Sequence, residues 1–184
     1  QIWAWRAGRI KAIQKTVSHM AVLFSFEEKI YQDAKVPVTF VGHPLGALVK
    51  ASMSKEAAYE SFQLDSHRPI VTLFPGSRHS ELNHHLPVMI ETVKKILSEK
   101  QDTQFALMLA EHFDAEKIRA QLPPEIKIIQ KNMYDLLQIT NAAIAVSGTI
   151  TLEIALMQVP HCILYRFNAF TYWIAKKLIR VQYI

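Results

Sequence analysis

Short apolar runs alternate with helical patterns along most of this chain, and this alternation limits its fold more than any other feature. From residue 69 onward, runs with the length and apolar character of buried strands lie at 70–74, 105–110, 126–129, 142–146 and 162–165. Helical patterns lie between and after them, at 79–100, 115–121, 134–139, 149–157 and 170–179. Strands and helices in this order form a parallel sheet covered on both faces. We therefore expect an α/β fold with a Rossmann-like, doubly wound parallel sheet.

The first part of the chain holds less material of the same kind. We expect a basic helix at 3–15, strands at 20–24 and 36–41, and a helix at 26–34. Prolines, glycines and serines then surround one helical pattern at 55–62, which is typical of a linker. The predicted regions are the end of one α/β domain at 1–45, a linker at 46–68 and a second α/β domain at 69–184. Because the chain lacks an initiator methionine and stops just after a basic helical pattern, we interpret both ends as internal to a longer protein.

Charge and cysteine content narrow the function classes. The formal net charge is +5 and the isoelectric point about 9.3, which favours an anionic partner. Nucleic acid, phosphates and acidic lipid are all compatible with that charge. The single cysteine, Cys162, excludes an internal disulfide and a cysteine zinc site, and so indicates a reducing cytoplasm. No apolar run reaches the roughly 18 to 20 residues that a membrane-crossing helix needs, so any membrane contact is expected to be peripheral.

The turn after the strand at 70–74 is the strongest candidate binding feature. Pro75, Gly76, Ser77 and Arg78 join this buried strand to a helix that contains Glu81. Backbone N–H groups and a cation therefore converge at the carboxyl edge of the sheet, where α/β folds bind ligands. Arg78 could hold a diphosphate and offset its charge as it leaves. The alternative is an ordinary turn with an ion-paired arginine.

A second turn with the same design follows the strand at 142–146. Gly148 permits close approach of the backbone, and Ser147 and Thr149 place hydroxyls at the start of the next helix. Glu153, one turn along, could accept the hydroxyls of a ribose while the helix start faces phosphate. The alternative is an arrangement that only caps the helix. Two such turns on one sheet describe a nucleotide site better than either alone, while no P-loop or dinucleotide fingerprint is present.

Two further segments carry candidate residues. Gly42 and His43 end the strand at 36–41, where a histidine would face an interdomain cleft, although a satisfied turn histidine is the simpler interpretation. The last segment has the composition of a helix that binds anionic lipid or, alternatively, packs its aromatic face on the sheet. Its candidate membrane-facing residues are Phe170, Tyr172, Trp173, Lys176, Lys177 and Arg180.

Five short motifs, taken in their order along the chain, resemble those of the bacterial lipid A disaccharide synthase family. The matching runs are Trp3-Ala4-Trp5-Arg6, Phe40-Val41-Gly42-His43-Pro44-Leu45, Leu73-Phe74-Pro75-Gly76-Ser77-Arg78 with Glu81, Ser147-Gly148-Thr149 with Leu152-Glu153, and Tyr165-Arg166 followed by 170–176. The resemblance implies a glycosyltransferase B fold, with a cleft between two Rossmann-like domains, of which the first binds the acceptor and the second the UDP-sugar.

The resemblance also implies a reaction and a set of site residues. The reaction transfers 2,3-diacylglucosamine from its UDP-linked form to 2,3-diacylglucosamine 1-phosphate, giving a β-1,6 disaccharide and UDP without a metal or other cofactor. Arg78 is implied as the required arginine beside the donor phosphates, and the general base is expected in a missing amino-terminal half, so this fragment alone should be inactive. The implied donor and substrate contacts are Gly42, His43, Gly76, Ser77, Glu81, Met133, Tyr134, Ser147, Gly148, Thr149, Glu153 and Arg166, with Met133 and Tyr134 bracketing uracil.

The implied partners are the acylated UDP-glucosamine donor, the acylated glucosamine phosphate acceptor and anionic membrane lipid, but no nucleic acid. A homodimer is compatible with this description, and the implied location is the cytoplasmic side of the inner membrane, peripherally bound. Two other functions stay open. One is another UDP-N-acetylglucosamine enzyme of this architecture, such as a 2-epimerase or a peptidoglycan transferase. The other is a basic, non-catalytic module that binds nucleotides or membranes.

Overall fold

The computed structural model describes residue 2 and residues 7–165, which form two compact units. The first unit extends to Leu48 and the second begins at Val49. Arg166 and the predicted membrane-facing helix at 170–179 lie outside the described residues. Within the described part of the chain, no helix combines the length and apolarity that crossing a bilayer requires.

The first unit is a small β-α-β arrangement. Its strands β1 (Met20–Val22) and β2 (Val38–Phe40) pair in parallel, and α2 (Ser25–Asp33) connects them. A 3-10 helix at Ala7–Arg9 and α1 (Ile10–Thr16) precede β1, and α3 (Leu45–Leu48) follows β2. Its buried apolar core consists of Ile2, Val22, Tyr31 and Val36.

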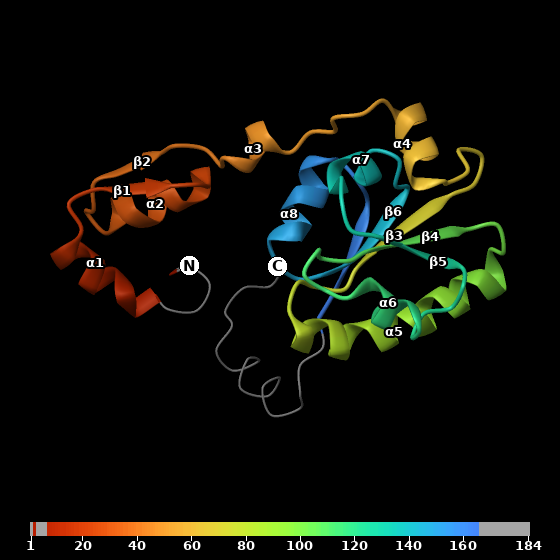
Figure 1. The fold of residues 1–184 in the computed structure, drawn as a ribbon. Coiled ribbons are helices and arrows are strands. Elements are labelled where there is room, and N and C mark those ends of the chain that lie inside the picture. The colour runs from red at the N-terminus through yellow and green to blue at the C-terminus, as the bar shows by residue number, and fades with distance from the viewer. Residues whose placement is uncertain (1, 3–6, 166–184) are drawn as a thin grey trace. The chain divides into compact units, whose positions relative to one another are not determined.

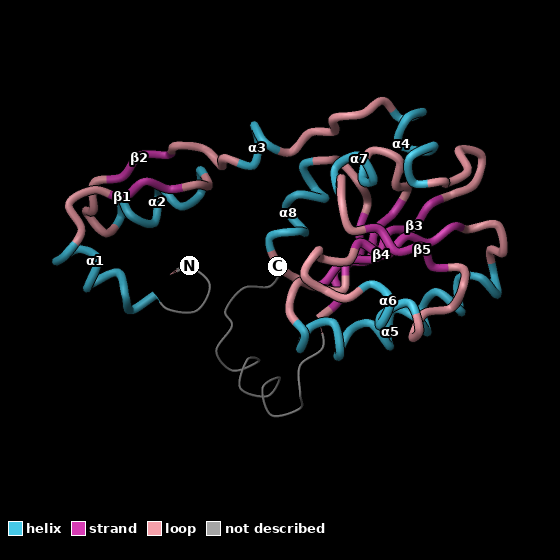
Figure 2. Tube along the Cα trace, in the orientation of Figure 1, coloured by secondary structure: helices cyan, strands magenta, loops and turns pink. Residues whose placement is uncertain are grey.

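The second unit contains a five-stranded sheet in which every neighbouring pair is parallel. Figures 1 and 2 show this sheet between two layers of helices. The strands, in the spatial order β5-β4-β3-β6-β7, have the bounds β3 Ile70–Phe74, β4 Gln104–Met108, β5 Ile126–Ile129, β6 Ala142–Val146 and β7 His161–Leu164. The helices are α4 Lys55–Phe62, α5 His79–Glu99, α6 Ala115–Arg119, α7 Met133–Leu137 and α8 Thr149–Leu156.

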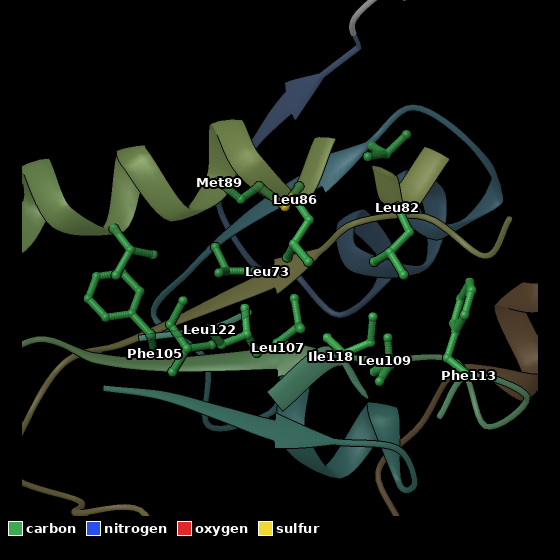
Figure 3. Close-up of a cluster of buried hydrophobic side chains, with 13 residues drawn as sticks. Leu73, Leu82, Leu86, Met89, Phe105, Leu107, Leu109, Phe113, Ile118 and Leu122 are labelled. Carbon is green, nitrogen blue, oxygen red and sulfur yellow. The ribbon is translucent and has the colours of Figure 1, made fainter. Parts of the chain in front are cut away.

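The alternation of side chains along the strands divides the core between the two faces of the sheet. Leu73 and Phe105 face α5 and α6, where they pack with Leu82, Leu86 and Met89 (Figure 3). Ile70 and Phe74, one residue out of phase with Leu73, contribute to the clusters under α4, α7 and α8. Strands covered on both faces are apolar nearly throughout, which explains why the sequence shows them as continuous apolar runs.

Helix α4 lies inside the predicted linker at 46–68 but packs into the core of the second unit. Ala58 is fully buried and Phe62 is buried beside Ile70. Ser54 begins this helix by accepting a hydrogen bond from the Ala57 backbone N–H at 3.2 Å. The domain limits proposed from the sequence stay a prediction, but α4 itself is part of the second unit's packing.

Strand β3 marks the point where the order of the sheet reverses. The chain passes from β3 to β4 and β5 on one side, then returns to place β6 and β7 on the other. In doubly wound sheets, the connections that leave two adjacent strands in opposite directions open a crevice at their carboxyl ends. This fold therefore predicts a ligand site beyond the carboxyl ends of β3 and β6.

Candidate functional site

A pocket of about 410 Å³ lies at the carboxyl ends of β3 and β6, at the reversal of strand order. Its volume falls within the range of about 300–1,000 Å³ that is typical of small-molecule sites. Both turns singled out in the sequence contribute to its wall. The lining residues are Phe74, Gly76, Ser77, Arg78, Glu81, Met108, Ala110, Met133, Val146, Ser147, Gly148, Thr149, Ile150 and Glu153.

Gly76 and Glu81 shape the turn after β3. Gly76 has a φ of +102°, a conformation that side chains rarely adopt, and a β-carbon there would lie 2.5 Å from Glu81 Oε2. That same oxygen accepts the backbone N–H groups of Ser77 at 3.1 Å and Arg78 at 3.4 Å. The N–H groups that we expected to face phosphate are thus directed at Glu81. This carboxylate therefore holds the turn in shape.

Arg78 presents its guanidinium at the pocket wall. One of its nitrogens, Nη1, donates to Glu81 Oε1 at 2.8 Å, and the Arg78 side chain is 78% exposed. A guanidinium has five N–H donors, so this ion pair leaves most of them available. Because solvent screens the exposed Arg78 end of this ion pair, Arg78 can turn toward an incoming anion at small cost.

The start of α8 forms the opposite wall of the pocket. Gly148 occupies the N-cap position, and no side chain caps the helix there. The hydroxyl and backbone N–H of Thr151 both donate to the Gly148 carbonyl, at 2.8 and 3.2 Å. A β-carbon on Gly148 would meet nothing within 4 Å. The first turn of α8 thus presents uncapped backbone N–H groups, aided by the helix dipole, next to open space, which is an arrangement suited to an anion.

Tyr134 and Glu153 are joined by a hydrogen bond beside this helix start. The Tyr134 hydroxyl donates to Glu153 Oε1 at 2.7 Å. Burial, with the neighbouring Glu153 carboxylate adding to it, raises the pKa of Tyr134 to about 12. Met133 lines the pocket, whereas Tyr134 is not among the lining residues and turns its hydroxyl to Glu153 instead. The predicted bracketing of uracil by both residues stays untested.

Other predicted residues lie elsewhere or outside the described range. Gly42 and His43 belong to the first unit, where His43 Nδ1 accepts the Leu45 N–H at 3.2 Å and its ring lies 5.5 Å from that of Phe24. Arg166 and the candidate membrane-facing residues Phe170, Tyr172, Trp173, Lys176, Lys177 and Arg180 fall outside the described residues.

Two histidines that were not among the predicted site residues, His79 and His112, pack on Phe113. His79 directly follows the pocket residue Arg78, and His112 comes two residues after the pocket residue Ala110. The His79 ring lies 4.8 Å and the His112 ring 4.3 Å from the buried ring of Phe113. The position of His112 shortly after β4, at the ligand-binding edge of a parallel sheet, was the signal that could have identified it. Among the residues that the structure describes, no group of three or more His, Cys, Asp or Glu side chains could hold a metal ion.

Several solved structures share this arrangement of helices and strands. A Listeria monocytogenes protein provisionally described as a UDP-N-acetylglucosamine 2-epimerase superposes with a TM-score of 0.57 at 17% identity, over 80% of this chain and 42% of its own. The wall teichoic acid polymerase TagF gives a TM-score of 0.55 at 13% identity, over 97% of this chain and 46% of its own. At such low identity these likenesses concern the fold alone. They confirm the predicted α/β fold of glycosyltransferase B type.

Curated sequences match much more closely. The lipid-A-disaccharide synthase of Coxiella burnetii (strain Dugway 5J108-111) is 53% identical over 184 residues, and that of Geobacter sulfurreducens is 44% identical over 187. Each match covers 100% of this chain and 49% of the relative, so the chain spans about half the length of these proteins. The model of the lipid-A-disaccharide synthetase family matches residues 1–184. With the motifs, the fold and this match in agreement, the chain belongs to the lipid-A-disaccharide synthetase family.

Proposed function

We propose that the pocket holds the UDP-sugar donor of a lipid A disaccharide synthase. The observation that carries this proposal is that turns 75–78 and 147–149, on two adjacent parallel strands, line one pocket at the reversal of strand order. Membership of the family and the names of the relatives support the choice of a glycosyltransferase over other nucleotide-binding functions.

In this proposal, the two walls of the pocket contact different groups of the donor. The start of α8 supplies backbone N–H groups to the diphosphate, and Arg78 supplies a mobile cation from the other side. Glu153 accepts a hydroxyl of the ribose. Apolar lining residues such as Met108, Met133 and Ile150 shelter the remainder of the nucleotide from water.

The reaction makes one bond and breaks another at the same carbon. The 6-hydroxyl oxygen of diacylglucosamine 1-phosphate attacks the anomeric carbon of the donor sugar, and the bond from that carbon to the β-phosphate oxygen breaks. The bonding electrons leave with UDP, and the proton of the hydroxyl passes to a base. Negative charge therefore grows on the diphosphate, which is where Arg78 and the α8 N–H groups act. The base is expected from the part of the family's sequence that this chain does not contain.

The acylated substrates place this reaction at a membrane surface. The basic and aromatic residues in segment 166–184, together with the net charge of +5, support a peripheral association with anionic lipid on the cytoplasmic side of the inner membrane. The partners proposed for the protein are therefore the UDP-linked donor, the acylated glucosamine phosphate acceptor and that lipid surface.

Mass spectrometry of the reaction products tests this function in the full-length protein. With UDP-diacylglucosamine and diacylglucosamine 1-phosphate supplied in detergent micelles, we expect a disaccharide 1-phosphate and an equal amount of UDP. Conversion of a UDP-amino sugar to its 2-epimer, or transfer to a peptidoglycan precursor, would favour the alternative enzymes. Absence of the disaccharide from a folded, UDP-binding preparation would contradict the proposal.

A further inference from the structure

The two carboxylates in the pocket wall differ in how their oxygens are occupied. Glu81 uses both: Oε1 accepts the Arg78 guanidinium, and Oε2 accepts two backbone N–H groups. Glu153 uses one, because its Oε1 accepts the Tyr134 hydroxyl. Among the described residues nothing hydrogen-bonds Glu153 Oε2. Glu153 is therefore the pocket carboxylate with an oxygen available to a ligand.

Tyr134 is held by the core rather than by the pocket. It belongs to α7, and its ring packs against the buried cluster that includes Phe74, Leu137 and Ile154. This packing restricts the two bonds about which the ring can rotate, so it holds the hydroxyl beside Glu153. Burial raises the pKa of Tyr134 to about 12, so the hydroxyl keeps its proton and continues to donate even at alkaline pH.

Glu153 gains its orientation from this fixed donor. It lies on α8, its side chain is half-buried, and without a partner its carboxylate could rotate about its terminal bond. The 2.7 Å hydrogen bond to Oε1 restricts that rotation and separates the roles of the two oxygens. Glu153 lines the pocket, and this hydrogen bond leaves its Oε2 as the oxygen available to a ligand.

We propose that Tyr134 is a positioning residue whose hydroxyl orients Glu153 so that Oε2 accepts a ribose hydroxyl, which makes the site select ribonucleotides over their deoxy analogues. This inference rests on the proposed function and assigns Tyr134 a role different from bracketing uracil. A site that hydrogen-bonds a ligand hydroxyl rejects the analogue that lacks it, because its own polar group is then left unpaired. The discrimination depends on the orientation of Oε2, and therefore on Tyr134.

Calorimetric titration of the full-length protein with UDP, 2′-deoxy-UDP and 3′-deoxy-UDP tests the inference. Because a hydrogen bond to a charged group is stronger than one between neutral groups, we expect one deoxy analogue to bind about tenfold or more weakly than UDP. In Tyr134→Phe we expect this ratio to fall to about threefold or less, with weaker UDP binding and an unchanged Kd for that analogue. Glu153→Gln should lower the ratio similarly, and the double variant should lower it no further.

Tyr59→Phe is the matched control, because Tyr59 is also partly buried against the sheet but packs on the cluster that includes Ala58 and Phe62. It should keep the full ratio. A purely structural role for Tyr134 would weaken UDP and both analogues equally. If UDP binds and Tyr134→Phe keeps the full ratio, or if the unsubstituted protein shows no preference, the inference is overturned while the donor site stands. Failure of UDP to bind the unsubstituted protein overturns both proposals.

Discussion

Gly76 lies so close to Glu81 that a β-carbon on the glycine would be 2.5 Å from the glutamate's Oε2 and 2.6 Å from its β-carbon. The opposite wall of the pocket behaves differently, because a β-carbon on Gly148 would meet no atom within 4 Å. The two glycines of the pocket thus have separate reasons to be glycine. Gly76 is required by the conformation of its turn, whereas Gly148 leaves open space in which a ligand could lie.

We expect Gly76→Ala to destabilise the protein by about 1–3 kcal/mol. The positive φ of +102° strains any side chain, and the contact with Glu81 forces apart the turn that the Ser77 and Arg78 N–H groups hold closed. Urea unfolding of the full-length protein measures the change. An unfolding free energy equal to that of the unsubstituted protein would show that the turn relaxes freely and that Glu81 does not hold it.

We expect Gly148→Ala to leave the unfolding free energy within about 0.5 kcal/mol of the original. Its added methyl group enters open space in the pocket, at the helix start where we propose that the donor phosphates bind. UDP binding should therefore weaken by about tenfold or more, since a displaced diphosphate loses charge-assisted hydrogen bonds. Titration calorimetry with UDP, beside Gly76→Ala as the comparison, measures the effect. Unchanged affinity would place the phosphates elsewhere.

We expect Arg78→Ala to lower kcat by about 100-fold or more while changing the unfolding free energy by less than about 1 kcal/mol. The loss of turnover follows from the proposal that Arg78 offsets the charge that develops on the leaving diphosphate. The change in stability is small because the Arg78 end of its ion pair with Glu81 is exposed to solvent. Lys94→Ala is the control, since Lys94 pairs with Glu91 at 2.8 Å across the same three-residue spacing but within α5 and outside the pocket lining. It should keep full turnover. Near-original turnover in Arg78→Ala would remove this residue from the mechanism.

Asp135, a residue of α7, forms hydrogen bonds with the segment that precedes α4. Its carboxylate accepts the N–H of Met53 at 2.7 Å and both the N–H and the hydroxyl of Ser52, at 2.7 and 2.8 Å. Burial by itself raises the pKa of Asp135, but these hydrogen bonds outweigh it and leave the pKa below its ordinary value. The carboxylate's contribution is thus complete above the unfolded-state pKa of about 3.9 and is lost as pH falls through the lower folded-state value.

We therefore expect the unfolding free energy to fall as pH drops below about 4, and to fall less steeply in Asp135→Asn. At neutral pH that variant should be less stable by about 1.5–3 kcal/mol, because an amide replaces a carboxylate that accepts three hydrogen bonds. Asp102→Asn, at an exposed position, should show the original acid dependence. Equal slopes for Asp135→Asn and the unsubstituted protein would contradict this account.

The fold of the second unit was predictable because its central strands, β3, β4 and β6, are largely buried. Strands β3, β5 and β6 have the predicted bounds, whereas β4 and β7 each begin one residue earlier than predicted and β4 ends two residues earlier. In the first unit the predicted strand at 20–24 ends at Val22 instead. The Phe24 N–H donates to Glu27 Oε2 at 3.3 Å, and Phe24 is the residue before the first turn of α2. The apolar periodicity of the sequence does not show that Phe24 bonds to this helix and not to a neighbouring strand.

The position of the pocket was predictable from the sequence, but the contacts within it were not. Two strand-to-helix turns at the carboxyl edge of one sheet were enough to place Arg78 and Gly148 in a common pocket. The expected hydroxyl cap on α8 is absent, because Gly148 occupies that position and no side chain caps the helix. The partners of Glu81 and Glu153 depend on side-chain rotamers and on residues distant in sequence, such as Tyr134, and so needed the structure.

A crystal structure of the full-length protein with UDP tests the central claim most directly. The account predicts the diphosphate within hydrogen-bonding distance of the backbone N–H groups at the start of α8 and of the Arg78 guanidinium, with the ribose at Glu153. UDP bound away from β3 and β6, or bound there with its diphosphate distant from both turns, would contradict it.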